Sequence, residues 1–497
     1  MTVAALLVLL TLVTAVHCRR FNPLHHSGAA SPFFDAPAQF GVSPSTPSQC
    51  AVDQVAYIVR HGSRYPEPGS FAGWQALFSK LQNATYTARG PLAFLPSWVP
   101  PVDDIPHEPF FLSSTGAQEA FQLGVELRKL YRFTKGGDNF TVWSAGQQRV
   151  VDTATYFTLG YLSQGNYLSA QNENRGHVVT MPDSVNFTFA DSLTPSAACP
   201  AYSSGDTSVK ATVFRRTNQG NIAKRLNQFL DGLTLNATDI GVMQDLCGFQ
   251  AEVSGDTRFC DIFQDSEWLD YEYAHDLNYY YGSGPGNPFS ATVGYPWLKA
   301  IADLFSSGPN TTSLGGNFVP PPLIMGFTHD NNLPPIVSAL GVWNTSSFPG
   351  VYPLSTSHAD PRRNFRSSFL VSFRGYVALE RLSCDPHDPP RSVQHTSGKV
   401  VLGPGTSPGA QKYVRLKINN AVVPLPGCAG GPGSSCSLAS FQNYVASRAA
   451  VAGDFVQRCG LQDVQNATGI LNVFTNVPSI IGRSSILTVP LPYANAP

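Results

Sequence analysis

Residues 52–66 read VDQVAYIVRHGSRYP, and this stretch decides the fold that the 497-residue chain is expected to adopt. The apolar, β-branched run from Val52 to Val59 is typical of a strand buried inside a sheet. The run stops at Arg60-His61-Gly62, which predicts a loop directly after the strand. Because α/β proteins keep their functional sites on the loops that follow such strands, we expect an α/β fold with its site here.

A second unit of the same kind lies at residues 321–341, which read PPLIMGFTHDNNLPPIVSALG. Its apolar run predicts another buried strand at 321–328, and His329 and Asp330 follow that strand as His61 follows the first. Asn332 and the early prolines then favour the start of a helix. The chain therefore repeats the architecture of its first unit.

Two helices are predicted between these units. Residues 115–131 begin with Thr115-x-x-Gln118, which matches a capping box, and then place large or small apolar side chains at helical spacing, namely Ala120, Phe121, Gly124, Leu127 and Tyr131. A short strand at 141–143 and a helix from about residue 147 to 162 follow. Arg149 falls in the first turn of this helix, where helix termini attract anions, so Arg149 is a candidate for binding an anion.

The fold class predicted from these patterns is α/β, with a large α/β domain whose central sheet is flanked by helices and a smaller inserted α-helical domain. We expect a signal peptide at 1–18, an N-terminal arm at 19–49, the α/β catalytic domain at 50–164 and 301–497, and the helical insertion at 165–300. In the last third, the segments FLVSF, ALERL and YVRLKIN predict further strands.

Composition narrows the class of protein. Apolar residues make up 42% of the chain and charged residues 13%, which fits a globular enzyme and excludes a disordered chain. The formal net charge is −1 and no Lys/Arg run occurs, so neither nucleic acid nor an anionic membrane is expected as a partner. The uncharged run at residues 3–16 is too short to span a bilayer and is typical of a signal peptide.

Cysteines and glycosylation motifs indicate a secreted protein, extracellular or in the cell wall. Without Cys18, an even set of cysteines remains, consistent with disulfides: Cys50, Cys199, Cys247, Cys260, Cys384, Cys428, Cys436 and Cys459. Eight cysteines allow 105 pairings, and spacing alone does not choose among them. Asn-x-Ser/Thr motifs occur at Asn83, Asn139, Asn186, Asn236, Asn310, Asn344 and Asn466.

The residue types around the first strand suit hydrolysis of a phosphate monoester. This reaction needs cations around the phosphoryl oxygens, a nucleophile in line with the bridging oxygen, and an acid for the departing alkoxide. His61 is an imidazole nucleophile, and Arg60 and Arg64 flank it with guanidiniums that bind oxyanions by paired hydrogen bonds. Asp330 is the candidate acid.

The segment RHGSRYP at 60–66 resembles the signature of the histidine acid phosphatases, and HDNN at 329–332 resembles their second motif. LSSTGAQEAFQLGVEL, SAGQQRVVDTA and DLNYYYGSGPGN resemble the fungal acid phosphatase and phytase branch, and the likeness extends over about residues 50–459. The resemblance implies a fold shared with phosphoglycerate mutase relatives. It also implies metal-independent catalysis without a cofactor.

The same resemblance implies a role for each site residue. His61 would form a phosphohistidine, Asp330 would donate the proton to the leaving group, and the phosphate would be bound by Arg60, Arg64, Arg149 and His329. It further implies the disulfides Cys50–Cys384, Cys199–Cys459, Cys247–Cys260 and Cys428–Cys436.

The expected substrate is a small phosphomonoester such as phytate, and a homo-oligomer is possible. Lys80 is the only lysine in the first hundred residues, whereas phytate-specialised relatives tend to be lysine-rich there, so a broad acid phosphatase with little phytate preference is an alternative. The acidic run at 267–276 would either admit anions at low pH or form a solvated face. Two further alternatives are a phosphoryl-transferring mutase relative and a secreted binding protein of this fold that has lost catalysis.

Overall fold

The computed structural model describes residues 21–133, 140–162, 176–183, 188–202, 207–309, 319, 321–343, 351–385, 409–475 and 485–488. The expected signal peptide at 1–18 lies outside these ranges, as do four of the glycosylation motifs, at Asn139, Asn186, Asn310 and Asn344. The asparagines of the other three motifs are exposed: Asn83, Asn236 and Asn466.

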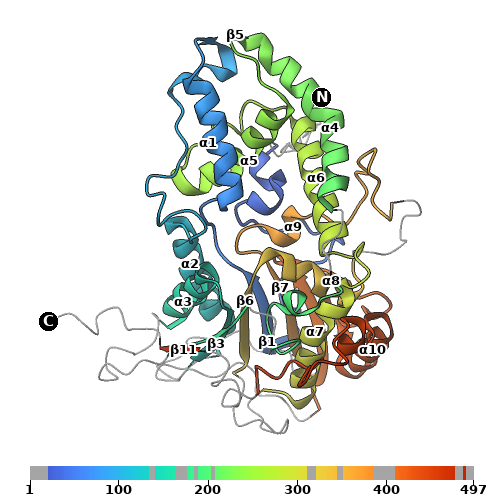
Figure 1. The fold of residues 1–497 in the computed structure, drawn as a ribbon. Helices are drawn as coiled ribbons and strands as arrows, with labels where there is room; N and C mark the ends of the chain where they lie inside the picture. The colour runs from blue at the N-terminus through green and yellow to red at the C-terminus, as the bar shows by residue number, and fades with distance from the viewer. Residues whose placement is uncertain are drawn as a thin grey trace, which may run out of the picture.

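One mixed sheet lies at the centre of the larger part of the molecule (Figure 1). Its described strands are β1 (Cys50–Arg60), β3 (Phe140–Ala145), β4 (Gly176–Met181), β6 (Leu323–Thr328), β7 (Tyr376–Cys384), β8 (Gln411–Ile418), β9 (Ala421–Val422), β10 (Cys436–Ser437) and β11 (Ser485–Thr488). They run in the order β10-β8-β7-β1-β6-β3-β4-β11, with β9 paired to β8. The four strands β1, β6, β3 and β4 are parallel, and the others are antiparallel to their neighbours.

Strand β1 is buried on both faces. Val55 to Val59 are at most 2% exposed, as a near-continuous apolar run in a parallel sheet requires. The strand predicted at 52–59 is therefore present and extends to Arg60. The strands predicted at 141–143 and 321–328 are also present, as β3 and β6.

The described helices are α1 (Pro68–Gln82), α2 (Ser114–Tyr131), α3 (Gln148–Leu162), α4 (Thr207–Leu226), α5 (Ala237–Ser254), α6 (Asp265–Gly282), α7 (Ser290–Ser307), α8 (Leu333–Leu340), α9 (Ser368–Val371), α10 (Leu438–Ala452) and α11 (Phe455–Arg458). Short 3-10 helices are η1 (Pro23–His26), η2 (Gly28–Ala30), η3 (Gly90–Leu92), η4 (Leu95–Ser97), η6 (Pro195–Ala198), η7 (Asn227–Phe229), η8 (Asp330–Asn332) and η9 (Pro432–Ser434). None of the helices in the described ranges is both long and apolar enough to cross a membrane.

Helices α2 and α3 pack on each other at a separation that only glycine allows. A Cβ atom on Gly160 would lie 2.0 Å from the carbonyl oxygen of Phe121, and one on Gly124 would lie 2.2 Å from that of Phe157. Helix α3 in turn contacts β3, β4 and β6, whereas α8 contacts β1 and β7, and α10 contacts β8. In Figure 1, α2 and α3 accordingly lie to the left of the sheet and α7, α8 and α10 to its right.

A smaller, mostly helical unit lies above the sheet in Figure 1. It has its own hydrophobic cluster, in which Trp74 and Leu77 of α1 are joined with Met243 and Leu246 of α5 and Trp268 of α6. A two-stranded sheet of β2 (Thr87–Ala88) and β5 (Leu230–Asp231) also belongs to this part of the chain. Two separate segments, one after the first strand and one after residue 206, therefore build the helical unit.

The start of α7, residues 290–300, was expected in the helical insertion but packs on α8 and α10 beside the main sheet, and the expected insertion at 165–300 needs two further corrections. First, β4 at Gly176–Met181 is a strand of the main sheet, because its apolar run GHVVTM pairs in parallel with β3. Second, α1 was expected in the α/β part at 50–164, but it packs on α5 of the helical unit. Neither pairing leaves a local sequence signal, since each joins segments far apart in the chain.

Three local predictions were also wrong. The N-cap of α2 is Ser113, whose side chain accepts a hydrogen bond from the Gly116 amide, so Thr115-x-x-Gln118 is not the capping box. Phe121 was placed in the apolar stripe of that helix but is 38% exposed. The segment FLVSF at 369–373 was predicted as a strand, yet most of it forms the short helix α9.

The N-terminal arm is packed into the molecule. Residues 21–49 contain the short helices η1 and η2, and Ser27 and Ser31 are fully buried. The Phe373 amide donates a hydrogen bond to the carbonyl oxygen of Ser31, and the Ala36 amide donates one to that of Asn419. Backbone hydrogen bonds therefore join the arm to the segment just before β7 and to the segment just after β8.

The disulfides have the pairing that the family resemblance implies. They are Cys50–Cys384, Cys199–Cys459, Cys247–Cys260 and Cys428–Cys436. Disulfides of this kind persist in oxidising compartments, so they fit an extracellular protein.

A buried ionic network joins α6 to the loop before α9. Glu272 and Asp276 are fully buried on α6, and Arg363 bridges them, with Nη2 at 3.1 Å from Glu272 and Nε at 2.6 Å from Asp276. Arg366 adds a second contact to Glu272 at 2.7 Å. Burial opposes ionisation of Glu272, but His26, Arg366 and Arg363 outweigh it and lower its pKa to about 2. These two acids of the 267–276 run are therefore paired inside the protein and do not form a solvated face.

Replacing Arg363 with methionine should destabilise the protein by about 3–5 kcal/mol, because buried Asp276 loses its cation and buried Glu272 loses one of its two arginines. Urea unfolding followed by tryptophan fluorescence measures the change. Arg362→Met is the matched control, because Arg362 is the exposed neighbour and its ion pair is with Asp360 outside this network. An Arg363→Met protein as stable as the Arg362→Met protein would contradict the structural role of this network.

Candidate active site

The register between β1 and β6 brings two predicted loops together. Arg60 lies opposite Thr328 in the parallel ladder, so His61 and His329 are the next residues of adjacent strands. The His61 amide donates to the Thr328 carbonyl oxygen at 3.0 Å, and the two imidazole rings are 6.0 Å apart between centroids. Strand β3 pairs with the other edge of β6, and α3 with Arg149 begins shortly after it. The site therefore lies at the carboxyl ends of three parallel strands.

His61 is held as one tautomer. Its ring is 1% exposed, and Nδ1 lies 2.9 Å from the carbonyl oxygen of Gly62. Because a carbonyl only accepts hydrogen bonds, Nδ1 carries the hydrogen and Nε2 carries a lone pair. Burial, together with the positive charges of Arg60, Arg64 and Arg149, lowers the pKa of His61 well below its ordinary value. His61 is thus a neutral imidazole at mildly acidic pH.

Asp330 is held as a carboxylate by neighbours from two units. Its Oδ2 accepts a hydrogen bond from the Tyr279 hydroxyl of α6 at 2.8 Å and lies 3.2 Å from Nη2 of Arg60. Burial raises the pKa of Asp330, but Arg60, Arg64 and the Tyr279 hydroxyl outweigh it and lower that pKa to about 2. Arg60 is itself fixed, because Nη1 donates to the carbonyl oxygens of Ala29 and Val371.

The other two arginines lie around an aromatic ring. The guanidinium of Arg149 is 4.1 Å from the centroid of Phe110, and that of Arg64 is 6.0 Å from it. Arg149 donates from Nη2 to Nδ1 of His329 at 3.4 Å, and Arg64 donates to Glu67 at 2.8 Å. Burial and the charge of Arg64 lower the pKa of Arg149 to about 10, which leaves it protonated in acid.

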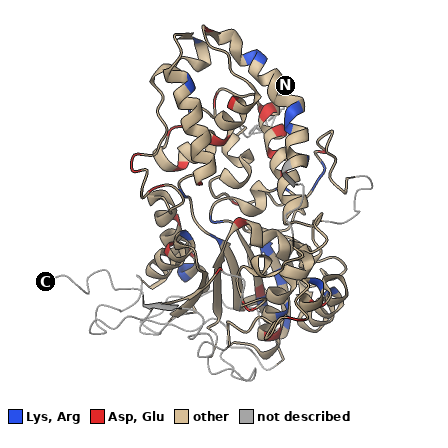
Figure 2. Cartoon of the chain, viewed as in Figure 1, with Lys and Arg blue, Asp and Glu red and all other residues tan. Residues whose placement is uncertain are grey.

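The site carries an excess of positive charge. Among the described residues, the carboxylates in contact with the three guanidiniums are Asp330 on Arg60 and Glu67 on Arg64. Arg149 contacts no carboxylate there, and its Nε has no hydrogen-bond partner in the described structure. Elsewhere acidic and basic residues are interspersed along the chain (Figure 2). Such a gathering of guanidiniums in a buried pocket suits a phosphate dianion.

The loop that carries His61 is clamped against α2 and α3. A Cβ atom on Gly62 would lie 2.7 Å from the carbonyl oxygen of Gly116, so this position requires glycine. The Gly62 amide donates to Oγ1 of Thr153 on α3. The amide and the hydroxyl of Ser113 both donate to the carbonyl oxygen of Ser63, each at 2.9 Å. His61 therefore rests on a backbone that has little freedom to move.

The structure brings together every catalytic and phosphate-binding residue that the sequence analysis proposed: Arg60, His61, Arg64, Arg149, His329 and Asp330. Sequence reasoning missed Tyr279, Phe110, Thr153 and Ala29 as neighbours of the site. Tyr279 lies in DLNYYYGSGPGN and Thr153 in SAGQQRVVDTA, two of the segments that carry the family resemblance, but nothing local in either segment points to Asp330 or to Gly62.

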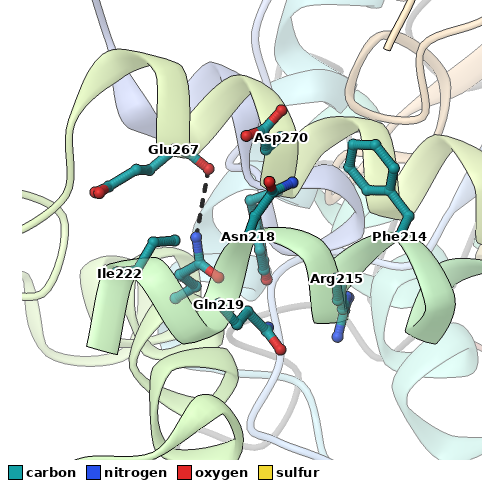
Figure 3. Close-up of a pocket in the computed structure, with 9 residues that line it drawn as sticks. Phe214, Arg215, Asn218, Gln219, Ile222, Glu267 and Asp270 are labelled. Atoms are coloured by element: carbon teal, nitrogen blue, oxygen red, sulfur yellow. Dashed lines mark hydrogen bonds between the residues drawn. The ribbon is translucent and has the colours of Figure 1, made fainter. Parts of the chain in front are cut away.

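Two other features of the described residues lie apart from this site. A small hollow between α4, α5 and α6 is lined by Arg215, Asn218 and Gln219 on one side and by Glu267 and Asp270 on the other (Figure 3). It contains none of the residues proposed for catalysis or phosphate binding. Within the described ranges, no group of three or more His, Cys, Asp or Glu side chains is arranged to hold a metal ion.

Comparison with known proteins identifies the family. The chain belongs to branch 2 of the histidine phosphatase superfamily, whose model matches residues 51–419. An acid phosphatase from Komagataella pastoris is 30% identical over 453 residues, covering 89% of this chain and 87% of that protein. A phytase from Candida albicans is 27% identical over 451 residues, covering 89% and 88%.

Solved structures show the same fold. The phytase from D. castellii has a TM-score of 0.76 at 24% identity, covering 91% of this chain and 90% of that one. A Bifidobacterium longum multiple inositol polyphosphate phosphatase, in complex with inositol hexasulfate, has a TM-score of 0.58 at 12% identity, covering 85% and 98%. The predicted family, α/β fold class and enzyme class, a phosphoric monoester hydrolase, are confirmed.

Inorganic phosphate should raise the melting temperature of the protein at pH 5, because a bound phosphate anion relieves repulsion among the three guanidiniums. At a concentration 100-fold above its Kd, the stabilisation is about 2.7 kcal/mol. Arg149→Ala should remove most of this response, since Arg149 is the guanidinium without a carboxylate partner in the described structure. Differential scanning fluorimetry with a phosphate titration measures it. Arg128→Ala, which removes a cation packed on Tyr161 outside the site, should keep the full response.

Proposed function

We propose that this protein is a secreted acid phosphatase that hydrolyses phosphate monoesters, phytate included, through a phosphohistidine formed on His61. One observation carries the proposal. His61 is a buried, neutral imidazole with its lone pair on Nε2, and Arg60, Arg64 and Arg149 all lie close enough to lower its pKa. A nucleophile that needs no deprotonation is thereby combined with cations for the phosphoryl oxygens.

In the first step, the guanidiniums and His329 bind the phosphoryl oxygens while Nε2 of His61 attacks phosphorus. The bond from phosphorus to the ester oxygen breaks, and Asp330 gives its proton to the departing alkoxide. In the second step, water attacks the phosphohistidine, the nitrogen–phosphorus bond breaks, and Asp330 takes a proton from the water. Inorganic phosphate leaves, and His61 is again neutral.

The acid role of Asp330 depends on a change in its surroundings. Without a bound anion, the neighbouring guanidiniums keep its pKa at about 2. A phosphate dianion adds negative charge beside Asp330 and takes up hydrogen bonds from Arg60, so the pKa of Asp330 rises when substrate binds. This coupling favours protonation of Asp330 in the complex, and acidic solution favours it further.

The substrate range that we propose is that of a broad phosphatase that also accepts phytate. The relatives include proteins named acid phosphatase and phytase, so both activities are reasonable expectations. Lys80 does not add a free cation near the site, because it forms an ion pair with Asp239 in the helical unit. The scarcity of lysine in the first hundred residues favours broad specificity over a strict preference for phytate.

Secretion is part of the same proposal. The apolar N-terminal run, the four disulfides and the exposed motif asparagines Asn83, Asn236 and Asn466 all support export. Treatment of the protein recovered from a eukaryotic culture medium with an N-glycosidase tests it, since loss of mass would show passage through the secretory pathway.

The purified protein should release phosphate from both phytate and p-nitrophenyl phosphate between pH 2 and 7 with a chelator present. His61→Ala should lower kcat/KM on both by at least about 10³-fold, because the covalent step is lost. His358→Ala, which changes an exposed histidine, is the matched control, and melting curves check folding. Comparable kcat/KM on the two substrates indicates a broad phosphatase. No release from either substrate would refute the catalytic function and favour the binding-protein alternative.

Asp330→Asn should have unequal effects on two kinds of substrate. An alkyl phosphate has a poor leaving group that needs the proton, so its kcat should fall by about 10²–10⁴-fold. The p-nitrophenolate ion leaves without protonation, so the loss on that substrate should be far smaller. Steady-state rates at pH 5 measure both, with Asp303→Asn as a control at an exposed ion pair. Equal losses on the two substrates would show that Asp330 is not the acid.

A further inference from the structure

Two carboxyl groups from different units meet at one hydroxyl behind the nucleophile loop. Oγ of Ser63 lies 2.9 Å from Oε2 of Glu119 on α2 and 2.5 Å from Oε2 of Glu252 on α5. Ser63 is fully buried, Glu252 is 9% exposed, and Glu119 is half-buried. None of these three side chains takes part in the proposed reaction.

The number of hydrogens at this point limits the charge that it can hold. A serine hydroxyl carries one hydrogen, which satisfies one carboxylate, and its lone pairs face any second partner. Two ionised carboxylates at hydrogen-bonding distance from this oxygen would leave one contact without a hydrogen. The geometry is satisfied when one carboxyl is protonated, so that a chain of hydrogen bonds runs from carboxyl to hydroxyl to carboxylate.

The surroundings indicate which carboxyl holds the proton. Burial and the neighbouring Glu119 raise the pKa of Glu252 to about 7. Burial also raises the pKa of Glu119, but the charge of Arg374 and the Ser63 hydroxyl act in the opposite direction. The arrangement that fits is therefore a protonated Glu252 donating to Ser63, which donates to the Glu119 carboxylate.

Other charged groups packed against this cluster are already engaged. Arg374, from the segment before β7, lies 3.8 Å from Glu126 of α2 as well as facing Glu119. On the loop itself, the guanidiniums of Arg60 and Arg64 contact Asp330 and Glu67. No cation contacts Glu252 among the interactions of the described residues, so its negative charge would stay uncompensated.

Ser63 is coupled tightly to the nucleophile. It is two residues from His61, its carbonyl oxygen accepts the two hydrogen bonds from Ser113, and the loop touches α2 at Gly116. On the other side, Thr115 donates from its hydroxyl to the carbonyl oxygen of Glu252 at 2.6 Å. The last turn of α5 is thereby fastened to the first turn of α2, and both lie against the loop.

We propose that Glu252 is a positioning residue for the His61 loop, acting in its protonated form through Ser63 and Glu119, and that loss of its proton toward neutral pH loosens the loop. The link to activity rests on the proposed function, whereas the link to stability does not. The sign follows from linkage. The pKa of Glu252 is about 7 in the folded protein against an ordinary value of 4.5, so the folded state holds an extra proton between these values. Stability therefore falls as pH rises through this interval.

The test compares melting temperature and kcat/KM on p-nitrophenyl phosphate from pH 4.5 to 8 in the wild type and Glu252→Gln. A glutamine amide is neutral and donates as the protonated carboxyl does. Glu252→Gln should therefore match the wild type near pH 4.5 and melt about 2–4 °C higher near pH 7.5. The alkaline half-maximum of its kcat/KM should move up by about one pH unit.

Two more variants keep the test decisive. Glu119→Gln removes the negative charge that repels ionised Glu252. The melting temperature of this variant should therefore change less with pH than that of the wild type, and this holds even if Glu252→Gln folds poorly. Glu267→Gln, the matched control in the helical unit, removes a carboxylate that is already paired with Arg225, so it should leave the pH slope of activity unchanged.

Each outcome decides a separate point. If the melting slopes of Glu252→Gln and Glu119→Gln equal that of the wild type, no shared proton exists and the proposal is overturned. If the melting temperature of the variants changes less with pH than that of the wild type, but the pH dependence of kcat/KM is the same, the proton stabilises the fold only. The positioning role is then overturned. Absence of turnover in the wild type at every pH refutes the proposed function instead, and the melting slopes then decide whether the shared proton exists.

Discussion

The hydrogen bonds between β1 and β6 fix Arg60 opposite Thr328, and with it the place of every group that follows the two strands. A slip of one residue would turn the side chains of β1 to the opposite face of the sheet. The apolar run from Val55 to Val59 is buried throughout, so a slip would not expose it, and other contacts must set the register. On the far side of β1, Cys50 pairs directly with Cys384 of β7 and is joined to it covalently, which excludes alternative registers with that strand.

The helical unit supplies groups that reach the loops at the sheet edge. Tyr279 of α6 contacts Asp330, and Glu252 of α5 contacts Ser63, two residues after His61. One turn before Tyr279 along the same helix, Asp276 is bound to Arg363 in the buried network. The position of α6 over the site is therefore fixed by charge pairing that is sealed from solvent, not by the loops it contacts.

Sequence reasoning found the parts of the fold that local periodicity encodes. The runs at 52–59 and 321–328 are strands, and the helix that carries Arg149 begins at Gln148, one residue from the expected start. It failed where a distant partner decides the structure. FLVSF has the composition of a strand but folds as a turn of helix, and GHVVTM became a strand because β3 offered an open edge. Local propensity carries no information about such partners.

The same distinction applies to the site. The residues adjacent in sequence to the two strands were predictable, because a histidine and arginines after a buried strand have few structural uses. Glu119 and Glu252 gave no signal, since an isolated glutamate on a helix is typical of a solvated face and only the packing of α2 against α5 brings the two to Ser63. Tyr279 likewise lies within a run of tyrosines, of which Tyr281 bonds to the Leu354 carbonyl oxygen instead.

The contact from Arg60 to the carbonyl oxygen of Ala29 has a consequence for maturation of the chain. A guanidinium that we propose to bind phosphate has one of its donors fixed by the backbone oxygen of Ala29, which lies about eleven residues beyond the expected end of the leader at residue 18. Trimming that stops before Phe21 leaves this oxygen and the η1 helix in place. Trimming past Ala29 would remove this acceptor, and Nη1 of Arg60 would keep its hydrogen bond to the Val371 carbonyl oxygen. A cut that removes the proposed leader must therefore fall before Ala29 if this anchor of Arg60 is to be kept.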